Sequence, residues 1–199
     1  MSITDQDVQT LETSLKRLPD PAVQPFLVLV SGLPGTGKSF FSRRLAEREP
    51  AVVLETDALR RTLFKEPNYS AQESQRLFQA IHELVERLLG KGITVVLDAT
   101  NLVERHREVL YSIAERAGAH LIIVRTEAPD DAIRHQMEER TQKARDTHEE
   151  NGEADVNVYQ RMRASEEKIG RNHFTVNTSE NFEPVLQKIV RTIRRGNRV

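Results

Sequence analysis

Short apolar runs alternate with longer amphipathic segments along most of this chain. Five runs have the length and the composition of buried strands, at 26–30, 51–55, 93–98, 119–124 and 174–177. Segments with helical spacing of apolar residues predict helices at 40–48, 56–64, 71–89, 102–117, 129–140, 154–169 and 182–195. This alternation predicts an α/β fold, with a five-stranded parallel sheet that is flanked by helices and connected by right-handed crossovers.

The segment before the first strand predicts one further helix at 4–18. Its apolar positions fall on one helical face and comprise Val8, Leu11, Leu15 and Leu18. Prolines at 19, 21 and 25 then end the helix and stiffen the chain. We therefore expect residues 1–24 to form an N-terminal helix with a proline-rich link, which covers the principal domain at 25–199 by packing.

Composition narrows the class of protein. A chain of 199 residues suits one compact α/β domain, and a net charge of -1 provides no global field for nucleic acid or membrane. The absence of cysteine excludes disulfides and thiolate chemistry. The N-terminus is polar and acidic, unlike a signal peptide, and no apolar run approaches the ~20 residues that span a bilayer. We expect a cytoplasmic protein with no membrane segment.

A glycine-rich stretch follows the first predicted strand and matches G-x-x-x-x-G-K-[ST]. Its glycines allow the backbone to approach phosphate oxygens, and its N–H groups can form an anion-binding nest at a helix N-terminus. Lys38 can contact the β- and γ-phosphates, and the Ser39 hydroxyl can ligate Mg²⁺. The stretch predicts a nucleoside triphosphate site that comprises Gly32, Leu33, Pro34, Gly35, Thr36, Gly37, Lys38, Ser39 and Phe40.

Two acids occupy the ends of predicted strands, where ligands bind in open parallel sheets. Asp98 closes the third strand, and we expect it to hold Mg²⁺ together with Ser39, directly or through water. Asp57 follows the second strand and is a candidate general base for an acceptor hydroxyl. Taken alone, Thr56 or Asp57 could equally serve as the N-cap of the next helix. Arg60, one turn later, could clamp an anionic group of the acceptor.

Residues 141–153 are polar and contain few core-type residues, which predicts a mobile flap. Phosphoryl transfer gathers negative charge in the transition state, so movable cations are useful there. Arg140, Lys143 and Arg145 could supply them, although a solvated charged segment would have the same composition. The pattern leaves open whether Arg140 or Arg145 is the catalytic one.

Three stretches together resemble a known group of enzymes. Residues 32–39, Thr56-Asp57-Ala58-Leu59-Arg60 and Leu97-Asp98-Ala99-Thr100-Asn101-Leu102 are similar to the P-loop polynucleotide 5′-hydroxyl kinases of phage and bacteria. They also resemble the wider zeta-toxin-like and small-molecule kinases. The likeness extends from Pro25 to about Asn181. It implies a P-loop NTPase fold, with a kinase domain at 25–199 and an arginine-bearing lid at about 140–153.

The resemblance also implies roles for individual residues. Asp57 matches the general base, and Arg60 matches the arginine that binds the acceptor's phosphate. Asp98 and Asn101 match the acid and the amide that organise the loop serine, the metal and the nearby backbone. Arg140 and Arg145 match the positions at which flap arginines of these kinases contact the donor phosphates. Residues 177–179 lie where related kinases form part of the adenine pocket.

These observations predict an ATP-dependent phosphotransferase that uses Mg²⁺ and is similar to polynucleotide 5′-kinases. Its acceptor would be the 5′ end of a nucleic acid, or alternatively a small anionic metabolite or nucleotide sugar. A non-transferring ATP-binding switch or ATPase is the alternative from another class, and GTP remains open as the donor. Aromatic residues make up only 5% of the chain, and no basic and aromatic strip indicates an extended single-strand surface. The arginines near the C-terminus fit a solvated helix end.

Overall fold

The computed structural model describes residues 3–15, 17–146 and 154–196, apart from the side chains of 139–146 and 154–158. Five parallel strands form one sheet in the order β2-β3-β1-β4-β5. Their bounds are β1 Phe26–Ser31, β2 Val52–Glu55, β3 Val95–Asp98, β4 His120–Glu127 and β5 Phe174–Asn177. The predicted α/β fold with a five-stranded parallel sheet is therefore confirmed.

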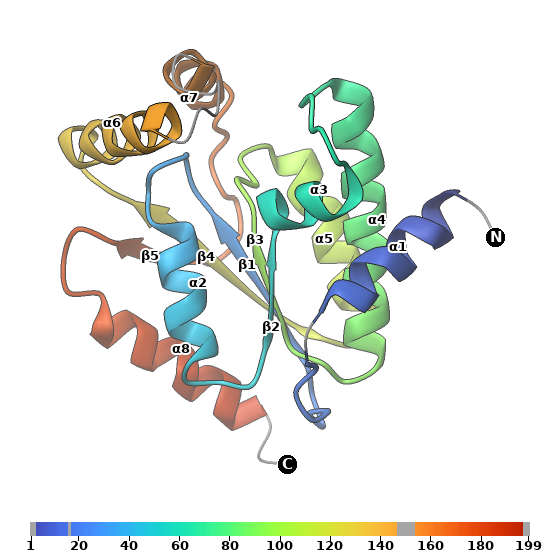
Figure 1. Ribbon diagram of the computed structural model, residues 1–199. Coiled ribbons are helices and arrows are strands. Elements are labelled where there is room, and N and C mark those ends of the chain that lie inside the picture. Colours follow the sequence, from blue (N-terminus) through green and yellow to red (C-terminus); the bar gives the residue numbers. More distant parts are fainter. Residues whose placement is uncertain (1–2, 16, 147–153, 197–199) are drawn as a thin grey trace.

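Helices cover both faces of this sheet (Figure 1). One face carries α2 (Lys38–Ala46) and α8 (Glu183–Gly196), and the other carries α4 (Ala71–Gly90) and α5 (Glu104–Arg116). Strand β1 serves both layers, since Leu27 and Leu29 join the α4 side while Val28 and Val30 join the α2 side. Burial on both faces explains why this strand is a continuous apolar run.

The N-terminal helix α1 (Ile3–Ser14) belongs to the core on the α4 side. Val8 and Leu11 are fully buried there, and Asp7 accepts two hydrogen bonds from Arg76, at 2.6 and 2.7 Å. The helix ends at Ser14, earlier than the predicted 18, where the Ser14 hydroxyl bonds to the Leu11 carbonyl at 2.6 Å. The apolar residues beyond it still pack, partly buried, against the core.

Helices α6 (Asp130–Asp146) and α7 (Ala154–Ala164) lie beyond the carboxyl ends of the strands (Figure 1). Helix α6 continues to Asp146, so the first part of the predicted flap is helical, and 147–153 lie outside the described residues. Helix α7 ends before the predicted 169, because Glu167 donates its backbone N–H to the Leu102 carbonyl at 3.0 Å. Ile169, the last apolar residue of that pattern, is buried in the core without being helical.

Arg107 on α5 joins two distant segments of the chain. Its guanidinium is fully buried and donates to the Asn101 carbonyl at 2.7 Å and to the Glu167 and Lys168 carbonyls, both at 3.1 Å. Glu104 accepts from its Nε at 2.8 Å and supplies the countercharge. The turn after β3 and the segment after α7 are therefore tied to one side chain.

Among the described residues, no helix combines the length and apolar character that crossing a bilayer requires.

We predict that Arg107→Met lowers the free energy of unfolding by about 3–5 kcal/mol, because it leaves buried carbonyls and Glu104 without their partner. Urea denaturation followed by circular dichroism measures the change. Arg116→Met is the control on the same helix, since the Arg116–Glu86 pair is largely exposed and is worth about 1 kcal/mol or less. Equal losses for both variants would contradict a special role for Arg107.

Candidate functional site

The phosphate-binding loop connects β1 to α2, and its shape depends on glycine at two positions. Gly37 has a φ of 73° and precedes the first turn of α2, and Gly35 has a φ of 83°. A Cβ on Gly37 would lie 2.7 Å from the Thr178 hydroxyl oxygen, and a Cβ on Gly35 would lie 3.1 Å from Ile133. The loop is therefore held between the turn after β5 and the first turns of α6, with no room for larger residues.

Hydrogen bonds inside the loop fix its remaining backbone. The Thr36 hydroxyl donates to the Leu33 carbonyl at 2.8 Å and bonds to the hydroxyl of Thr126, on β4, also at 2.8 Å. The Thr178 hydroxyl donates to the Thr36 carbonyl at 3.0 Å. Lys38 reaches across the loop and donates to the Leu33 carbonyl at 2.9 Å. The loop is thus shaped before any nucleotide binds, which lowers the entropic cost of binding one.

The N-terminus of α2 faces this loop. Its N-cap residue is Gly37, which has no side chain to cap the helix, so the first-turn N–H groups are available for an anion. Phe40 was predicted to belong to the nucleotide site, but its ring is 54% exposed and packs edge-on against Phe182, with ring centroids 5.7 Å apart. The Phe40 ring therefore packs against Phe182, and a contact between Phe40 and a nucleotide stays a prediction.

The turn after β3 supports the loop from the neighbouring strand. The Asn101 side chain donates to the Val30 carbonyl at 2.8 Å, and Gly32 donates its N–H to the Thr100 carbonyl at 3.0 Å. Asn101 itself adopts a left-handed backbone conformation, with a φ of 47°. Such strain in a residue other than glycine is maintained only when its surroundings determine it, and here the buried Arg107 holds its carbonyl.

Asp98 is the buried acid of the site and lies at the carboxyl end of β3. The sheet register places it beside Val30 of β1 and Glu55 of β2, and it is only 4% exposed. Burial raises the pKa of its carboxyl, against the hydrogen bond from Ser39 and the charge of Lys38, and the charge of Asp57 adds to the rise. Asp57 and Lys38 are therefore brought close to the same carboxylate from different elements.

This arrangement fits a divalent cation. One oxygen of Asp98 is buried without a hydrogen-bond partner among the described residues, and the Ser39 hydroxyl lies beside the same carboxylate. Carboxylate and hydroxyl oxygens are the ligands that Mg²⁺ prefers, and such sites usually complete the shell with substrate phosphates. Within the described chain no cluster of three or more acidic, histidine or cysteine residues offers a competing metal site.

Asp57 is positioned differently from a helix cap. Helix α3 (Thr56–Leu63) has Glu55 as its N-cap, without a side-chain hydrogen bond, so the alternative of Thr56 or Asp57 as the capping residue is wrong. The reason is that the helix begins directly at the end of β2, where the Thr56 hydroxyl donates to the Asp98 carbonyl at 3.3 Å. The Asp57 carboxylate is exposed and near Asp98.

Arg60 was predicted to clamp an anionic group of the acceptor, and in the structure its guanidinium forms a buried ion pair with Glu73. Arg60 is only 7% exposed. Its guanidinium donates hydrogen bonds to the Glu73 carboxylate and to the Ser74 hydroxyl, the latter at 3.3 Å. The ring of Tyr69 covers it, with the guanidinium carbon 4.7 Å from the ring centroid. Its Nε has no hydrogen-bond partner among the described residues. By contrast, Arg61 is exposed.

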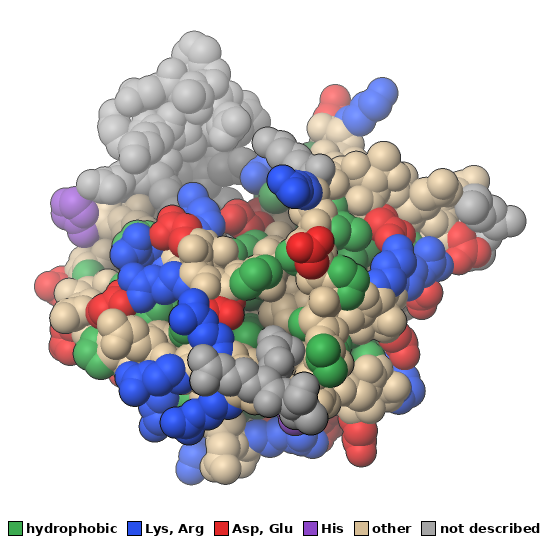
Figure 2. All heavy atoms as spheres, turned by 90° about the horizontal axis from the view of Figure 1, so that it is seen from below, with side chains coloured by type: hydrophobic (Ala, Val, Ile, Leu, Met, Phe, Trp, Pro, Cys, Tyr) green, Lys and Arg blue, Asp and Glu red, His purple; other side chains and the backbone are tan. Residues whose placement is uncertain are grey.

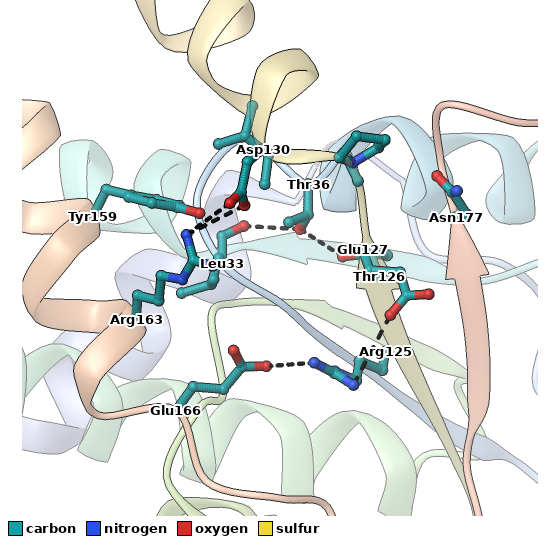
Figure 3. A pocket seen from close by; sticks show the side chains of 13 residues that line it. Leu33, Thr36, Arg125, Thr126, Glu127, Asp130, Tyr159, Arg163, Glu166 and Asn177 are labelled. Carbon is teal, nitrogen blue, oxygen red and sulfur yellow. Dashed lines mark hydrogen bonds and ion pairs between the residues drawn. The ribbon is translucent and has the colours of Figure 1, made fainter.

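A cavity of about 330 Å³ lies beside the phosphate-binding loop, on the β4 side (Figure 3). Its lining comes from the loop (Leu33 and Thr36), the end of β4, the start of α6, two residues of α7, Glu166 in the segment after α7, and Asn177. Two ion pairs cross it, Arg163 of α7 to Asp130 at 3.1 Å and Glu166, in the segment after α7, to Arg125 at 3.0 Å. Figure 3 shows these side chains converging from α6, α7, the segment after α7 and β4.

Some contributors to the site lacked a recognised sequence signal. Thr126, Tyr159 and Glu166 join the site through contacts between segments that are distant in sequence. Glu73 did have a signal, since Ser70 and Glu73 match the S-x-x-E capping box, and the Ser70 hydroxyl accepts from the Glu73 N–H at 3.2 Å. The backbones of Arg140 and Arg145 lie in α6, but their side chains lie outside the described part of the chain.

Comparison with known proteins shows three likenesses. The chain is 26% identical over 122 residues to the L-seryl-tRNA(Sec) kinase of Methanococcus maripaludis, a match that covers 59% of this chain and only 47% of that protein. A complex of the Mycobacterium tuberculosis APS kinase with AMPPNP and APS has a TM-score of 0.62 at 17% identity, over 87% of this chain and 99% of that one. A gluconokinase from Sinorhizobium meliloti has a TM-score of 0.58 at 19% identity, over 87% and 94%.

The two structural likenesses, at such low identities, concern the fold. The chain spans about half the length of the L-seryl-tRNA(Sec) kinase that it matches. A family model described as an AAA domain matches residues 27–169, from β1 through the segment after α7. Since that match covers more than half of its length, this chain belongs to the AAA domain family, and its fold is that of the P-loop NTPase kinases.

Proposed function

We propose that this protein is an ATP-dependent phosphotransferase that moves the γ-phosphate of ATP to an acceptor hydroxyl. The observation that carries this proposal is the exposed Asp57 carboxylate, which lies near Asp98 while Lys38 and Ser39 face Asp98 from the phosphate-binding loop. A nucleotide-binding site alone requires no acid at this position. A phosphotransferase does, because the acceptor hydroxyl must be oriented and its proton accepted.

The chemistry follows from this placement. The acceptor oxygen attacks the γ-phosphorus in line, its bond to phosphorus forms as the bond to ADP breaks, and its proton passes to Asp57. Lys38 and the N–H groups at the start of α2 stabilise the phosphate charge. Ser39 and Asp98 would hold Mg²⁺, which would neutralise charge on the β- and γ-phosphates.

The donor nucleoside would extend from the loop toward the β4 side. The cavity there is open to the turn after β5, where Asn177 lines it and Thr178 supports the loop. We infer that residues 177–179 border the base, as the resemblance to P-loop kinases implied. In the same proposal residues 140–153 act as a lid, and Arg140 or Arg145 reaches the donor phosphates from it.

For the acceptor we favour a nucleotide-bearing hydroxyl, such as the 5′ end of a polynucleotide. The sequence resemblance to polynucleotide 5′-kinases supports this class, as does a relative whose name places its acceptor hydroxyl on a tRNA. A small-molecule acceptor is the alternative, supported by the likeness to APS kinase and gluconokinase folds.

The basic end of α8 gives the nucleic-acid class no support. Figure 2 views the molecule from the end opposite the phosphate-binding loop and shows Lys and Arg side chains gathered on the α8 side. Two ion pairs involve α8, since Arg194 pairs with Glu49 and Glu183 pairs with Arg48. This patch therefore fits a solvated helix end, remote from Asp57.

We predict that Asp57→Asn lowers kcat by about 10²- to 10⁴-fold and changes the KM for ATP little, because the variant loses only the proton acceptor. The assay incubates the protein with γ-labelled ATP, Mg²⁺ and either a 5′-hydroxyl oligonucleotide, gluconate or no acceptor. Labelled GTP tests the donor base in parallel.

Two controls frame this assay. Lys38→Ala should abolish transfer, and Asp20→Asn, an exposed acid in the proline-rich link, should behave as the wild type. Label on the oligonucleotide supports the favoured acceptor, and label on gluconate supports the alternative. Release of phosphate alone, at the same rate in Asp57→Asn, would instead indicate an ATPase that phosphorylates nothing.

We further predict opposite effects of Asp98→Asn on the free and the nucleotide-bound protein. Because the pKa of Asp98 is raised in the folded state, its charged form costs stability at neutral pH, and this cost declines as the pH falls through the raised pKa and vanishes below the ordinary pKa of an aspartate. Removing the charge should raise the melting temperature of the free protein, by about 2–4 °C per kcal/mol regained. The stabilisation by Mg²⁺ and AMPPNP should shrink.

Differential scanning fluorimetry with and without Mg²⁺·AMPPNP measures both effects. Glu55→Gln is the control, since Glu55 lies at the end of the adjacent strand but is only partly buried. Unchanged stabilisation by Mg²⁺·AMPPNP in Asp98→Asn would exclude Asp98 as a metal-organising acid.

A further inference from the structure

The segment between α3 and α4 holds an aromatic residue in a strained and exposed position. Tyr69 has a φ of 55°, which is uncommon for a bulky side chain, and it is 56% exposed. Burial of an apolar ring therefore does not account for this conformation. Strain of this kind marks ligand-contacting sites when the surrounding structure enforces it.

Glu73 enforces the conformation. Its carboxylate accepts from the Asn68 N–H at 2.7 Å and from the Tyr69 N–H at 3.2 Å, and it pairs with Arg60. In an ordinary capping box this glutamate would bond to the N–H of the capping residue, but Asn68 Oδ1 accepts the Ser70 N–H instead, at 2.9 Å. Burial would raise the pKa of Glu73, but the hydrogen bonds from Asn68, Arg60 and Tyr69 outweigh it and hold the pKa below its ordinary value.

The same contacts define what Arg60 does. Its charge is matched by Glu73, and Tyr69 covers its guanidinium. An arginine that is buried, paired and covered cannot readily turn to an incoming anion without leaving Glu73 uncompensated. Arg60 therefore acts as a positioning residue for the Tyr69 ring.

The ring lies close to the proposed acceptor side. Asp57 and Arg60 are three residues apart on α3, a spacing that places side chains about 5–6 Å apart at their Cβ atoms. Because Tyr69 stacks on the guanidinium of Arg60, its ring lies beside the helix that carries Asp57. Figure 1 shows α3 and the segment that follows it opposite α6 and α7, with the phosphate-binding loop between them.

We propose that the exposed face of Tyr69 is a stacking platform for a nucleobase of the acceptor, an inference that rests on the proposed function and deepens it. One face of the ring contacts the Arg60 guanidinium, and the other remains for a planar ligand. The acceptor class is then a nucleoside with a free hydroxyl, either as a mononucleotide or at the end of an oligonucleotide. Stacking on such a ring changes affinity by about 5- to 100-fold.

Intrinsic fluorescence offers a direct test, because the chain contains no tryptophan. Tyr69→Trp places the chain's single tryptophan on the platform, where it can be excited selectively at wavelengths that tyrosine does not absorb. The variant is saturated with Mg²⁺·AMPPNP, so that the donor site is filled, and is then titrated with adenosine 3′-monophosphate, a 5′-hydroxyl oligonucleotide or gluconate. Stacking predicts quenching by one or both nucleoside ligands and none by gluconate. Val23→Trp is the control reporter, since Val23 is 80% exposed before the amino end of β1.

Calorimetry on the same AMPPNP-loaded protein supplies a second measure that does not depend on the tryptophan variant. Tyr69→Ala should weaken binding of the quenching ligand by about 5- to 100-fold, and Tyr69→Phe should restore it, because the ring rather than the hydroxyl stacks. The affinity for AMPPNP should be equal in all variants. A Tyr69→Ala variant that binds like the wild type would overturn the proposal.

The possible outcomes separate this inference from the proposed function. Quenching by the mononucleotide supports a small nucleotide acceptor, and quenching by the oligonucleotide alone supports a polynucleotide end. Normal AMPPNP binding without quenching by either ligand overturns the platform and leaves phosphoryl transfer intact. Loss of AMPPNP binding in the wild type would overturn the proposed function itself.

Discussion

The phosphate-binding loop has a shape that its own residues cannot maintain, and side chains from three other segments hold it. Thr178 fills the space beneath Gly37, Thr126 bonds to Thr36, and Asn101 bonds to the Val30 carbonyl. Each contact comes from the carboxyl end of a different strand. The parallel sheet is therefore more than a scaffold for the loop, because its order of strands decides which side chains can reach the loop from either side.

The buried charges of the molecule fall into two kinds. Arg107 and Glu73 are compensated by several partners each and fix the backbone of the turn after β3 and of the segment before α4. Asp98 is buried with one oxygen unpartnered among the described residues, and its raised pKa reflects that cost. The compensated charges of Arg107 and Glu73 fix the backbone around the site. The uncompensated carboxylate of Asp98 lies where a bound cation would supply the missing partner.

The donor side and the acceptor side that we propose for this site differ in how they are built. The donor side consists of backbone N–H groups and a lysine on a rigid loop, which suits a phosphate chain of any nucleotide. The acceptor side consists of side chains on α3 and on the segment after it, whose positions depend on the Arg60–Glu73 pair. Acceptor preference can thus change through a few residues around α3 without disturbing the loop, as expected when function resides in sites on a common fold.

The parallel sheet, the phosphate-binding loop and the acids at the strand ends could be predicted from the sequence, because each has a local signature. A buried strand is apolar throughout, a phosphate-binding loop has fixed glycine and lysine positions, and an acid at the end of a strand meets the other strand ends in space. Errors arose where the signature was only compositional. The polar stretch at 141–146 is helical, and the apolar Ile169 lies in the core outside any helix.

Tertiary contacts decided which charged and polar groups are available to a ligand. The spacing of Asp57 and Arg60 placed both on one face of α3, but only packing against α4 brought Glu73 to Arg60 and left Asp57 exposed. The strained Tyr69 and the threonines beneath the loop have the same origin. Local sequence specifies where a side chain starts along an element, and the partner that satisfies or covers it comes from residues far away in the chain, which a single sequence does not align.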